Sequence, residues 1–360
     1  MSSKSIYVIA EAGVNHNGNL KRAIEMVDAA AEAKVDAIKF QTFKAEKLAL
    51  SQAPKADYQI NQTGSSESQL EMLRKLELDK NSHFKIQDRC NLKGIQFLST
   101  PFDQNSLNFL IQSLKVPKLK IPSGEITNAP LLLKAAASGK PLIVSTGMCD
   151  MEEVKIALGV LAFGFTKSGN KPNIESFKNA FESPEGKYAL RNSITLLHCT
   201  SAYPAPFEDV NLKTMETMAS VFGLPVGYSD HTSGISVSIA AVACGAVVIE
   251  KHFTMDKTLP GPDHQASLDP EELKALVKAI REVEKALGVS NKFATPSEIE
   301  NREIARKSLV TTQNIKMGEL FTENNIDIKR PGNGISPLQY WDWIGKKAER
   351  DFKANELIIP

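Results

Sequence analysis

The chain has 360 residues, of which 42% are hydrophobic and 24% are charged, as is ordinary for a globular protein. Its formal net charge of +1 excludes the long-range attraction to nucleic acids or anionic membranes that a strongly basic surface exerts. The four cysteines form no CxxC pair, which argues against a disulfide framework and against a zinc–thiolate site. Because the net charge is close to zero, any anionic ligand must be bound by a local cluster of residues.

No stretch of the sequence predicts a signal peptide or a membrane span. The apolar stretch at the N-terminus is short and is interrupted by Glu11. The run over residues 235–249 is too short to cross a bilayer and contains serines. We expect a cytoplasmic protein with no nucleic-acid or membrane partner.

Short apolar runs alternate with helical patterns from the N-terminus to about residue 290. The first run predicts a buried strand over residues 5–10, and apolar residues at helical spacing predict a helix over 19–34. Further strands are predicted at 37–41, 95–99, 119–121, 142–145, 195–198, 226–228 and 247–250. Further helices are predicted at 105–114, 131–137, 151–161, 212–221, 235–244 and 269–287, the last with Asp269 as its N-cap.

Repeated strand–helix units predict a parallel sheet, and about eight strands over this length favour a closed (β/α)8 TIM barrel over an open sheet. We place the barrel at residues 1–289. Two insertions interrupt the pattern: residues 44–79 are predicted to be a lid or rim segment, and 167–191 a surface loop.

The character of the sequence changes after the barrel. Residues 290–304 are polar and are predicted to be a linker. Residues 305–360 contain short alternating pieces and several turn signals, which predict a small β-rich domain packed by Phe321, Trp341 and Trp343.

The C-terminal ends of barrel strands carry the chemistry of this fold, and two histidines fall there. His231 lies in SDHT and His252 in EKHFT, one strand–helix–strand unit apart. Two imidazoles suit a divalent first-row metal and leave positions open for a substrate oxygen. Two core or capping histidines would give the same spacing, so the pattern alone leaves both interpretations open.

Two lysines near strand ends predict an anion site. Lys39 lies in KFQTF and Lys120 in KIPSGE, and lysine is rarely buried without a partner. Together with Ser123 and Ser145 they would suit a phosphate or a carboxylate. Either lysine alone could instead extend along the surface to solvent, or act as the Schiff-base nucleophile of a class I aldolase.

Carboxylates fall on the same predicted face. They are Glu11, Glu125, Asp230 and Asp263. Near a metal and a sugar, carboxylates act as general acids and bases and bind hydroxyl groups. Each one taken singly also has an ordinary explanation in a turn or on the surface.

Together these segments resemble the sialic acid synthase family. The matching pieces follow the order of the family along nearly the whole chain: IAEAGVNHNG, KFQTF, STPFD, KIPSGE, STGM, LLHCTSAYPAP, GYSDHT, EKHFT, GPDHQAS and KRPGNGIS. The resemblance implies a TIM barrel followed by an antifreeze-like (SAF) domain. It also implies swapped homodimers, in which Arg330 of one chain reaches the sugar site of the other.

The resemblance also implies a role for each matching position. A divalent metal, Mn²⁺ or Mg²⁺, is expected on His231 and His252. Phosphoenolpyruvate is expected to bind Lys39, Thr100, Lys120, Ser123, Ser145 and Ser201, the last standing where several members have Asn or Thr. An N-acetylated amino sugar is expected to face Gln41, Phe102, Glu125, Tyr203, Asp263 and Arg330. Glu11 is expected to be the catalytic base, with Asp263 and Glu125 positioning sugar hydroxyls.

Short sequence motifs are used to rank the candidate substrates. KFQTF, KIPSGE and KADYQ look like bacterial synthases that make N-acetylneuraminate or legionaminate, while ITNAP leans to legionaminate. We rank N-acetylneuraminate synthesis from N-acetylmannosamine first, and legionaminate synthesis from 2,4-diacetamido-2,4,6-trideoxymannose second. A class I aldolase and a non-enzymatic antifreeze-like scaffold are remote alternatives.

Overall fold

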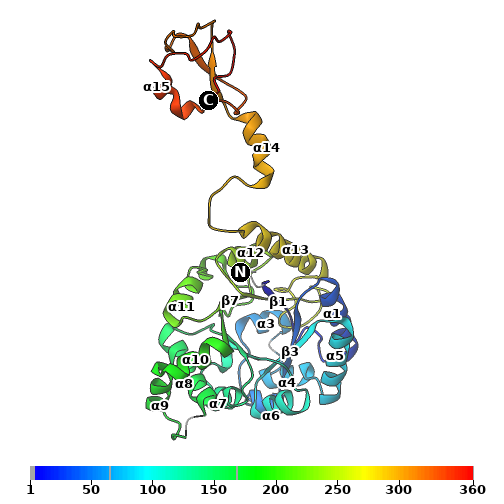
Figure 1. Cartoon of the computed structure of the whole chain (residues 1–360). Helices are drawn as coiled ribbons and strands as arrows, with labels where there is room; N and C mark the ends of the chain where they lie inside the picture. The colour runs from blue at the N-terminus through cyan, green and yellow to red at the C-terminus, as the bar shows by residue number, and fades with distance from the viewer. Residues whose placement is uncertain (1–4, 65, 168, 360) are drawn as a thin grey trace. The chain divides into compact units, whose positions relative to one another are not determined.

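The computed structural model describes residues 5–64, 66–167 and 169–359, which form two units, Met1–Gly288 and Val289–Pro360. The first unit is a ring of eight parallel strands surrounded by helices (Figure 1). The strands are β1 (Tyr7–Gly13), β2 (Ala37–Thr42), β3 (Gln96–Pro101), β4 (Leu119–Ile121), β5 (Leu142–Ser145), β6 (Ile194–Cys199), β7 (Val226–Asp230) and β8 (Val248–His252).

The strand order is β3-β2-β1-β8-β7-β6-β5-β4. The two end strands, β3 and β4, lie against each other, although no ladder joins them within the described residues. The result is a nearly closed TIM-like barrel, so the predicted fold class is confirmed, and each predicted strand is present with bounds shifted by at most three residues.

The helices that cover the barrel are mostly where the periodicity predicts them. They are α1 (Leu20–Glu32), α5 (Lys80–Lys93), α6 (Gln104–Asn108), α7 (Ala129–Ala137), α8 (Met151–Thr166), α11 (Thr214–Phe222), α12 (Ser236–Ala243) and α13 (Pro270–Leu287). A single π-helical turn, Phe109–Ser113, continues α6. Helix α5 is missed by the sequence analysis because it is polar and buries only His83, Ile86 and Cys90.

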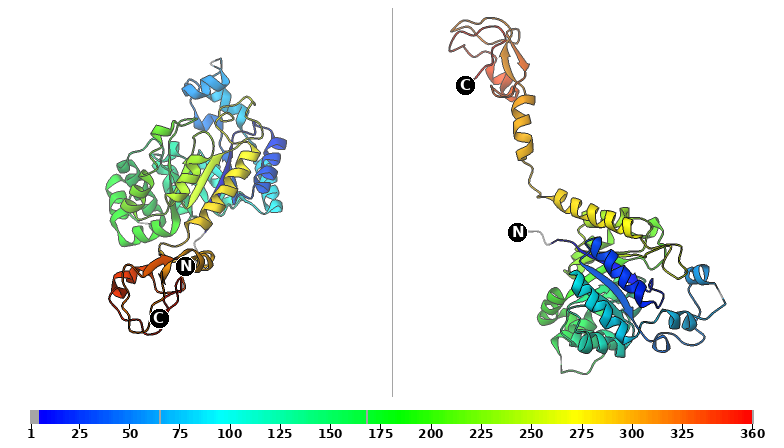
Figure 2. Two further views of the ribbon diagram at one scale, coloured as in Figure 1. Left: turned by 90° about the horizontal axis from the view of Figure 1, so that it is seen from above. Right: turned by 90° about the vertical axis from the view of Figure 1, so that its right-hand side faces the viewer.

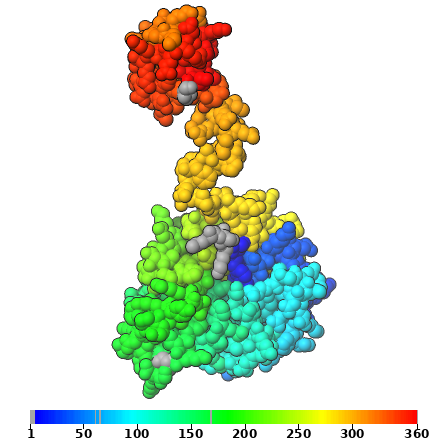
Figure 3. All heavy atoms as spheres, viewed as in Figure 1, coloured from blue at the N-terminus to red at the C-terminus, as the bar shows by residue number. Residues whose placement is uncertain are grey.

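The last barrel helix is joined to the start of the first strand. Arg281 of α13 donates a hydrogen bond to the Ile6 carbonyl (2.7 Å), and Glu284 accepts from the Ser5 hydroxyl (3.1 Å). The space-filling view shows α13 in yellow beside the blue N-terminal segment (Figure 3). These contacts tie the two ends of the barrel sequence together.

Two segments contain more helix than the sequence predicts. Residues 167–191 are not a loop, because they contain α9 (Ile174–Glu182) and α10 (Pro184–Ser193). Asn173 and Ser183 cap these helices, and Phe177 packs edge-on against Phe163 of α8 (5.4 Å between ring centres). The insertion after β2 contains α2 (Ala45–Leu48), α3 (Asp57–Thr63) and α4 (Gln69–Leu76).

The second unit has its own small core. Helix α14 (Pro296–Ala305) lies in the predicted linker, followed by the antiparallel pair β9 (Ser308–Thr311) and β10 (Ile326–Lys329), and then the short α15 (Tyr340–Trp343). Phe321 is buried and packs against Trp343 (5.5 Å). The prediction that Trp341 packs this core is wrong, since its side chain is 78% exposed. No helix among the described residues is long and apolar enough to cross a membrane.

Candidate active site

The interior of the barrel changes from apolar to polar along each strand. A buried apolar layer is formed by Ile9, Ala37, Leu98, Ile143, Leu197 and Val248. Side chains two positions apart on a strand point to the same side, so the next inward residues of five of these strands are Glu11, Lys39, Thr100, Ser145 and Glu250. The apolar layer closes the barrel, and the polar layer forms the floor of a cavity at the C-terminal ends of the strands.

The cavity has a volume of about 490 Å³. Thirteen of the fifteen predicted site residues line it: Glu11, Lys39, Gln41, Thr100, Phe102, Lys120, Ser123, Ser145, Ser201, Tyr203, His231, His252 and Asp263. They come from the eight strands or from the loops that follow them. The structure therefore brings together residues that are up to 252 positions apart in the sequence.

A buried network of two lysines and two carboxylates forms the floor. The ammonium of Lys39 lies 2.6 Å from Glu11 and 3.7 Å from Glu250, and it donates a hydrogen bond to the Thr100 hydroxyl (3.1 Å). The ammonium of Lys120 lies 3.3 Å from the other oxygen of Glu250. All four charged side chains are at most 5% exposed. Neither lysine extends to solvent, so that alternative is wrong for both.

The two carboxylates of this network titrate differently. Burial opposes the charge of Glu250, but Lys120 and Lys39 outweigh it and lower the pKa to about 2. Burial raises the pKa of Glu11 to about 7, because Lys39 offsets only part of the cost and Glu250 repels a second negative charge. Glu250 is therefore the permanent counter-ion of the lysines, and Glu11 is poised to exchange a proton near neutral pH.

Three serines surround the far side of the floor. The Ser123 hydroxyl lies 3.2 Å from the Cys199 sulfur and accepts a hydrogen bond from the Gly147 amide (3.0 Å). A Cβ at Gly147 would lie 2.3 Å from the Ser201 hydroxyl and 2.8 Å from that of Ser123, so only glycine lets both serines approach. The Ser145 hydroxyl is buried and has no hydrogen-bond partner within the described part of the chain. Since Ser145 lines the cavity, its hydroxyl can donate a hydrogen bond to a bound ligand.

The two histidines lie side by side at the cavity wall, with ring centres 5.5 Å apart. Nδ1 of His231 lies 2.7 Å from the Thr200 carbonyl, which it can reach only as a donor, so Nε2 keeps its lone pair. Nδ1 of His252 is buried with no hydrogen-bond partner among residues 5–64, 66–167 and 169–359, and it lies 3.9 Å from Asp263. Burial lowers the pKa of His231 to about 4 and that of His252 well below its usual value.

These features fit the metal expectation, although incompletely. Both imidazoles are held neutral, as metal ligation requires, and one carries a buried nitrogen without a partner. No group of three or more His, Cys, Asp or Glu side chains suited to a metal occurs in the described residues. Two imidazoles alone would leave the remaining positions of a metal to water and substrate oxygens.

Two predicted site residues, Glu125 and Arg330, are not among the residues that line this cavity of the first unit. Glu125 is buried next to the cavity in a 3₁₀ turn (Ser123–Glu125), where its carboxylate accepts a hydrogen bond from Asn128 (2.6 Å). Burial raises the pKa of Glu125. Arg330 is an exposed residue of the second unit, immediately before a cis proline.

The sequence analysis missed two kinds of cavity residue. Glu250 begins the EKHFT motif and was given no role, although a carboxylate two residues before His252 on the same strand faces the same way. Tyr58 and Gln59 line the cavity from α3, in the insertion after β2. No periodicity could have located them, because their place depends on how the insertion folds back over the barrel. Asp230 points elsewhere and forms a buried ion pair with Lys251 (3.0 Å).

Comparison with known proteins identifies the family. The NeuB family matches residues 26–292, and the SAF domain matches residues 306–360. The chain is 48% identical to the N,N'-diacetyllegionaminic acid synthase of Campylobacter jejuni, covering 99% of both chains. It is 46% identical to the enzyme of the same name from Legionella pneumophila, covering 99% of this chain and 94% of the other.

A solved structure is similar as well. The N-acetylneuraminic acid (sialic acid) synthetase of Leptospira borgpetersenii, crystallised with citrate, is 35% identical with a TM-score of 0.65, covering 83% of this chain and 90% of that chain. The resemblance to the sialic acid synthase family is thereby confirmed, but the similarity to legionaminic acid synthases is higher. The ranking of the two substrates is therefore reversed. By both its sequence and its fold, the chain belongs to the NeuB family.

Proposed function

We propose that this protein is an N,N'-diacetyllegionaminic acid synthase, which condenses phosphoenolpyruvate with 2,4-diacetamido-2,4,6-trideoxymannose and releases phosphate. One observation carries the choice of product: two N,N'-diacetyllegionaminic acid synthases are 46–48% identical to the chain over nearly its whole length. Synthesis of N-acetylneuraminate from N-acetylmannosamine is the second candidate, supported by the 35% identical sialic acid synthetase.

The floor of the cavity supports binding of phosphoenolpyruvate. Lys39 and Lys120 would neutralise its carboxylate and phosphate, and the hydroxyls of Ser123, Ser145 and Ser201 would donate hydrogen bonds. Both lysines lie in a site that excludes water, where their attraction for a phosphate or a carboxylate is little screened.

The methylene carbon of phosphoenolpyruvate would attack the aldehyde carbon of the open-chain sugar, and the aldehyde oxygen would take a proton from solvent and become a hydroxyl group. Water would then add to the resulting oxocarbenium carbon and give one proton to Glu11. The carbon–oxygen bond to phosphate would break as the new hydroxyl becomes the keto group, and phosphate would leave with that oxygen and the hydroxyl proton. Glu11 suits the role of base because its raised pKa lies close to neutral pH.

A divalent Mn²⁺ or Mg²⁺ would be held by His231 and His252 and would supply Lewis-acid polarisation of the sugar aldehyde. Asp263 lies next to His252, and burial raises its pKa to about 6. A carboxylate of this kind can accept a hydrogen bond from a sugar hydroxyl at neutral pH. The Tyr203 ring packs against His231 (4.3 Å between ring centres) and shields this end of the cavity from water.

The lysine network disfavours the aldolase alternative. A Schiff-base lysine must be neutral to attack a carbonyl group. Burial opposes the charge of Lys39, but Glu11 and Glu250 outweigh it and raise its pKa. Burial lowers the pKa of Lys120, so Lys120 is the position that a borohydride trapping experiment would test.

Phosphate release from phosphoenolpyruvate tests the proposed function. The assay compares 2,4-diacetamido-2,4,6-trideoxymannose with N-acetylmannosamine, each with Mn²⁺ and with or without EDTA. We expect chelator-sensitive turnover with a preference for the diacetamido sugar. Preference for N-acetylmannosamine would transfer the assignment to N-acetylneuraminate synthesis, and silence with both sugars would refute the synthase assignment.

A further inference from the structure

The insertion between β2 and α5, here called the rim segment (residues 44–64 and 66–79), forms one wall of the cavity mouth. Figure 1 shows α3 over the middle of the barrel ring, and Figure 2 shows the light-blue helices of this segment standing out from the barrel. The residues that it adds to the cavity lining are Leu48, Ala56, Tyr58, Gln59, Gln69, Met72, Leu73 and Leu76. Most of these are apolar, unlike the charged floor.

The base of the rim segment is closed on itself and attached to the barrel. The ammonium of Lys44 pairs with Glu77 (2.7 Å), whose other oxygen accepts from the Ala45 amide (2.6 Å). Helix α4 then packs on the barrel through a separate apolar cluster of Val14, Phe43, Met72 and Leu76, with Leu48, Leu73 and Phe102 at its edge. The wall is therefore held by its own ion pair and by apolar contacts with the barrel, without a ligand.

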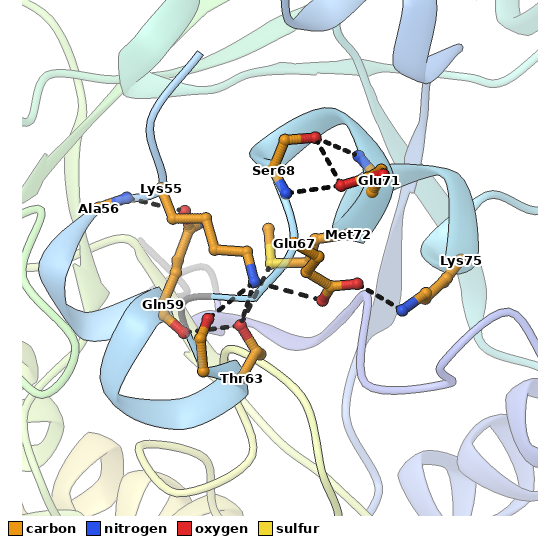
Figure 4. Close-up of polar contacts among 10 residues, drawn as sticks. Lys55, Ala56, Gln59, Thr63, Glu67, Ser68, Glu71, Met72 and Lys75 are labelled. Carbon is orange, nitrogen blue, oxygen red and sulfur yellow. Dashed lines mark hydrogen bonds and ion pairs between the residues drawn. The ribbon is translucent and has the colours of Figure 1, made fainter. Parts of the chain in front are cut away.

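A buried lysine holds α3 against α4 (Figure 4). The ammonium of Lys55, only 2% exposed, donates to the Thr63 hydroxyl (2.8 Å) and the Gly64 carbonyl (3.1 Å) and pairs with Glu67 (3.2 Å). All three of its donors are thereby used. Lys55, Thr63, Gly64 and Glu67 form what we call the clasp, which joins the end of α3 to the turn before α4.

Tyr58 lies in the same helix as the clasp residue Thr63 and lines the cavity. Its ring packs against Tyr203 (5.0 Å between centres), which in turn packs against His231 (4.3 Å). Gln62 of the same helix donates to Gln265 in the loop after β8 (2.7 Å). Helix α3 thus starts from the β2 side of the barrel and reaches loops that follow β6 and β8, which places it over the outer end of the cavity.

We propose that the rim segment selects the sugar: its apolar wall, with Leu73 as the specificity-determining residue and Lys55 as the positioning residue, accepts the 6-deoxy end of the substrate. This inference rests on the proposed function, in which the aldehyde end of the sugar lies at His231 and His252. The opposite end of the open chain then meets the wall. Contact with leucine and methionine makes the binding free energy of a methyl group more favourable. A hydroxymethyl group would lose hydrogen bonds to water there and would bind less well.

The test uses the full-length protein and compares kcat/KM for 2,4-diacetamido-2,4,6-trideoxymannose and N-acetylmannosamine. Leu73→Ser makes the wall polar without a buried charge, and we expect it to reduce the preference for the first sugar by about tenfold, within the range for one apolar contact. Lys55→Met keeps the length of the stem and removes the clasp. We expect it to raise the KM of the diacetamido sugar while the KM of phosphoenolpyruvate stays within about twofold.

Lys75→Met is the matched control, because Lys75 pairs with the same carboxylate, Glu67, but its side chain is 71% exposed and lines no part of the cavity. We expect wild-type kinetics from it. If the wild-type chain prefers the diacetamido sugar but Leu73→Ser and Lys55→Met keep the wild-type ratio, the wall does not select the sugar and only this inference fails. Preference of the wild-type chain for N-acetylmannosamine would refute both proposals.

A second measurement keeps the inference falsifiable without turnover. The diacetamido sugar should slow cleavage by a glutamate-specific protease within the rim segment of the wild-type chain and of Lys75→Met, and this protection should be lost in Lys55→Met. Equal protection in all three proteins, or none in the wild-type chain, would overturn the positioning role of Lys55. Circular dichroism of each variant checks that the barrel remains folded.

Discussion

At the scale of single residues, the site depends on charges that the barrel removes from water. Glu11 and Glu250 share two lysines, and the unequal sharing separates their pKa values. Since a carboxylate can act as a base only when ionised, the protonation of Glu11 should set the acidic side of the pH profile.

Substitution of Glu11 tests this role. We expect kcat/KM of the wild-type protein to fall as the pH drops through about 7, because protonated Glu11 cannot accept the proton of water. Glu11→Gln should lower kcat by about 10²–10⁴-fold and remove that limb of the profile. Steady-state phosphate release between pH 5.5 and 9 checks both. If the acidic side of the pH profile is unchanged in Glu11→Gln, the group that titrates there is not Glu11.

The two histidines are tested by metal binding as well as by rate. His252→Ala should abolish chelator-sensitive turnover and also weaken Mn²⁺ binding, which the free-ion signal in electron paramagnetic resonance reports directly. His264→Gln is the control, since His264 is buried and bonded to Thr254 (2.7 Å) but does not line the cavity. A fully active, EDTA-resistant His231→Ala/His252→Ala double variant would refute the metal assignment.

At the scale of elements, the helices that the sequence predicts well carry their own end signals. Asp269 caps α13 by accepting from the Glu272 amide (2.8 Å), while Glu272 accepts from the Asp269 amide (2.9 Å). Proline follows at the first helical position. Helix α5 has a comparable cap at Asp79, but it lacks an apolar face that would have made its interior visible.

Removal of the α13 cap should weaken the barrel. We expect Asp269→Ala to cost about 1 kcal/mol of the free energy of unfolding, because one orphan amide at the helix start loses its acceptor. Urea unfolding followed by circular dichroism measures this cost. Lys278→Ala, on the exposed side of the same helix, is the control and should change the free energy by less than about 0.5 kcal/mol.

At the scale of the whole molecule, the resemblance drawn from the sequence predicts that Arg330 of one chain reaches the sugar site of another. Arg330→Ala should raise the KM of the sugar more than that of phosphoenolpyruvate, while Arg350→Ala, an exposed arginine of the same unit, should leave both unchanged. Mixing and refolding Arg330→Ala with Glu11→Gln should restore activity, because one site of a mixed dimer then has both wild-type residues. If light scattering shows that dimers are present but activity is not restored, Arg330 does not act in the site of the other chain.

The sequence alone predicted the eight strands, the order of the units and eight of the cavity residues, because alternation along strands and the motifs at their ends are local signals. The family resemblance added Gln41, Thr100, Phe102, Ser201 and Tyr203. Lys39 and Lys120 were recognisable because they lie near the ends of apolar strands, and Glu11 because it interrupts the first apolar run. Tertiary structure alone decided which charges share a partner: Glu250 became the common counter-ion of two lysines because β2, β4 and β8 converge in the barrel.

The insertions and the second unit also contain features that only the tertiary structure decided. Tyr58 lines the cavity from α3, in an insertion whose fold depends on contacts such as the buried Lys55–Glu67 ion pair, and Trp341 is exposed whereas Trp343 packs on the core. Neither outcome has a periodic signal, since each depends on contacts between residues that no repeat relates. Local pattern thus predicts which elements form, whereas the burial of individual side chains and the sharing of charges are decided when distant elements pack together.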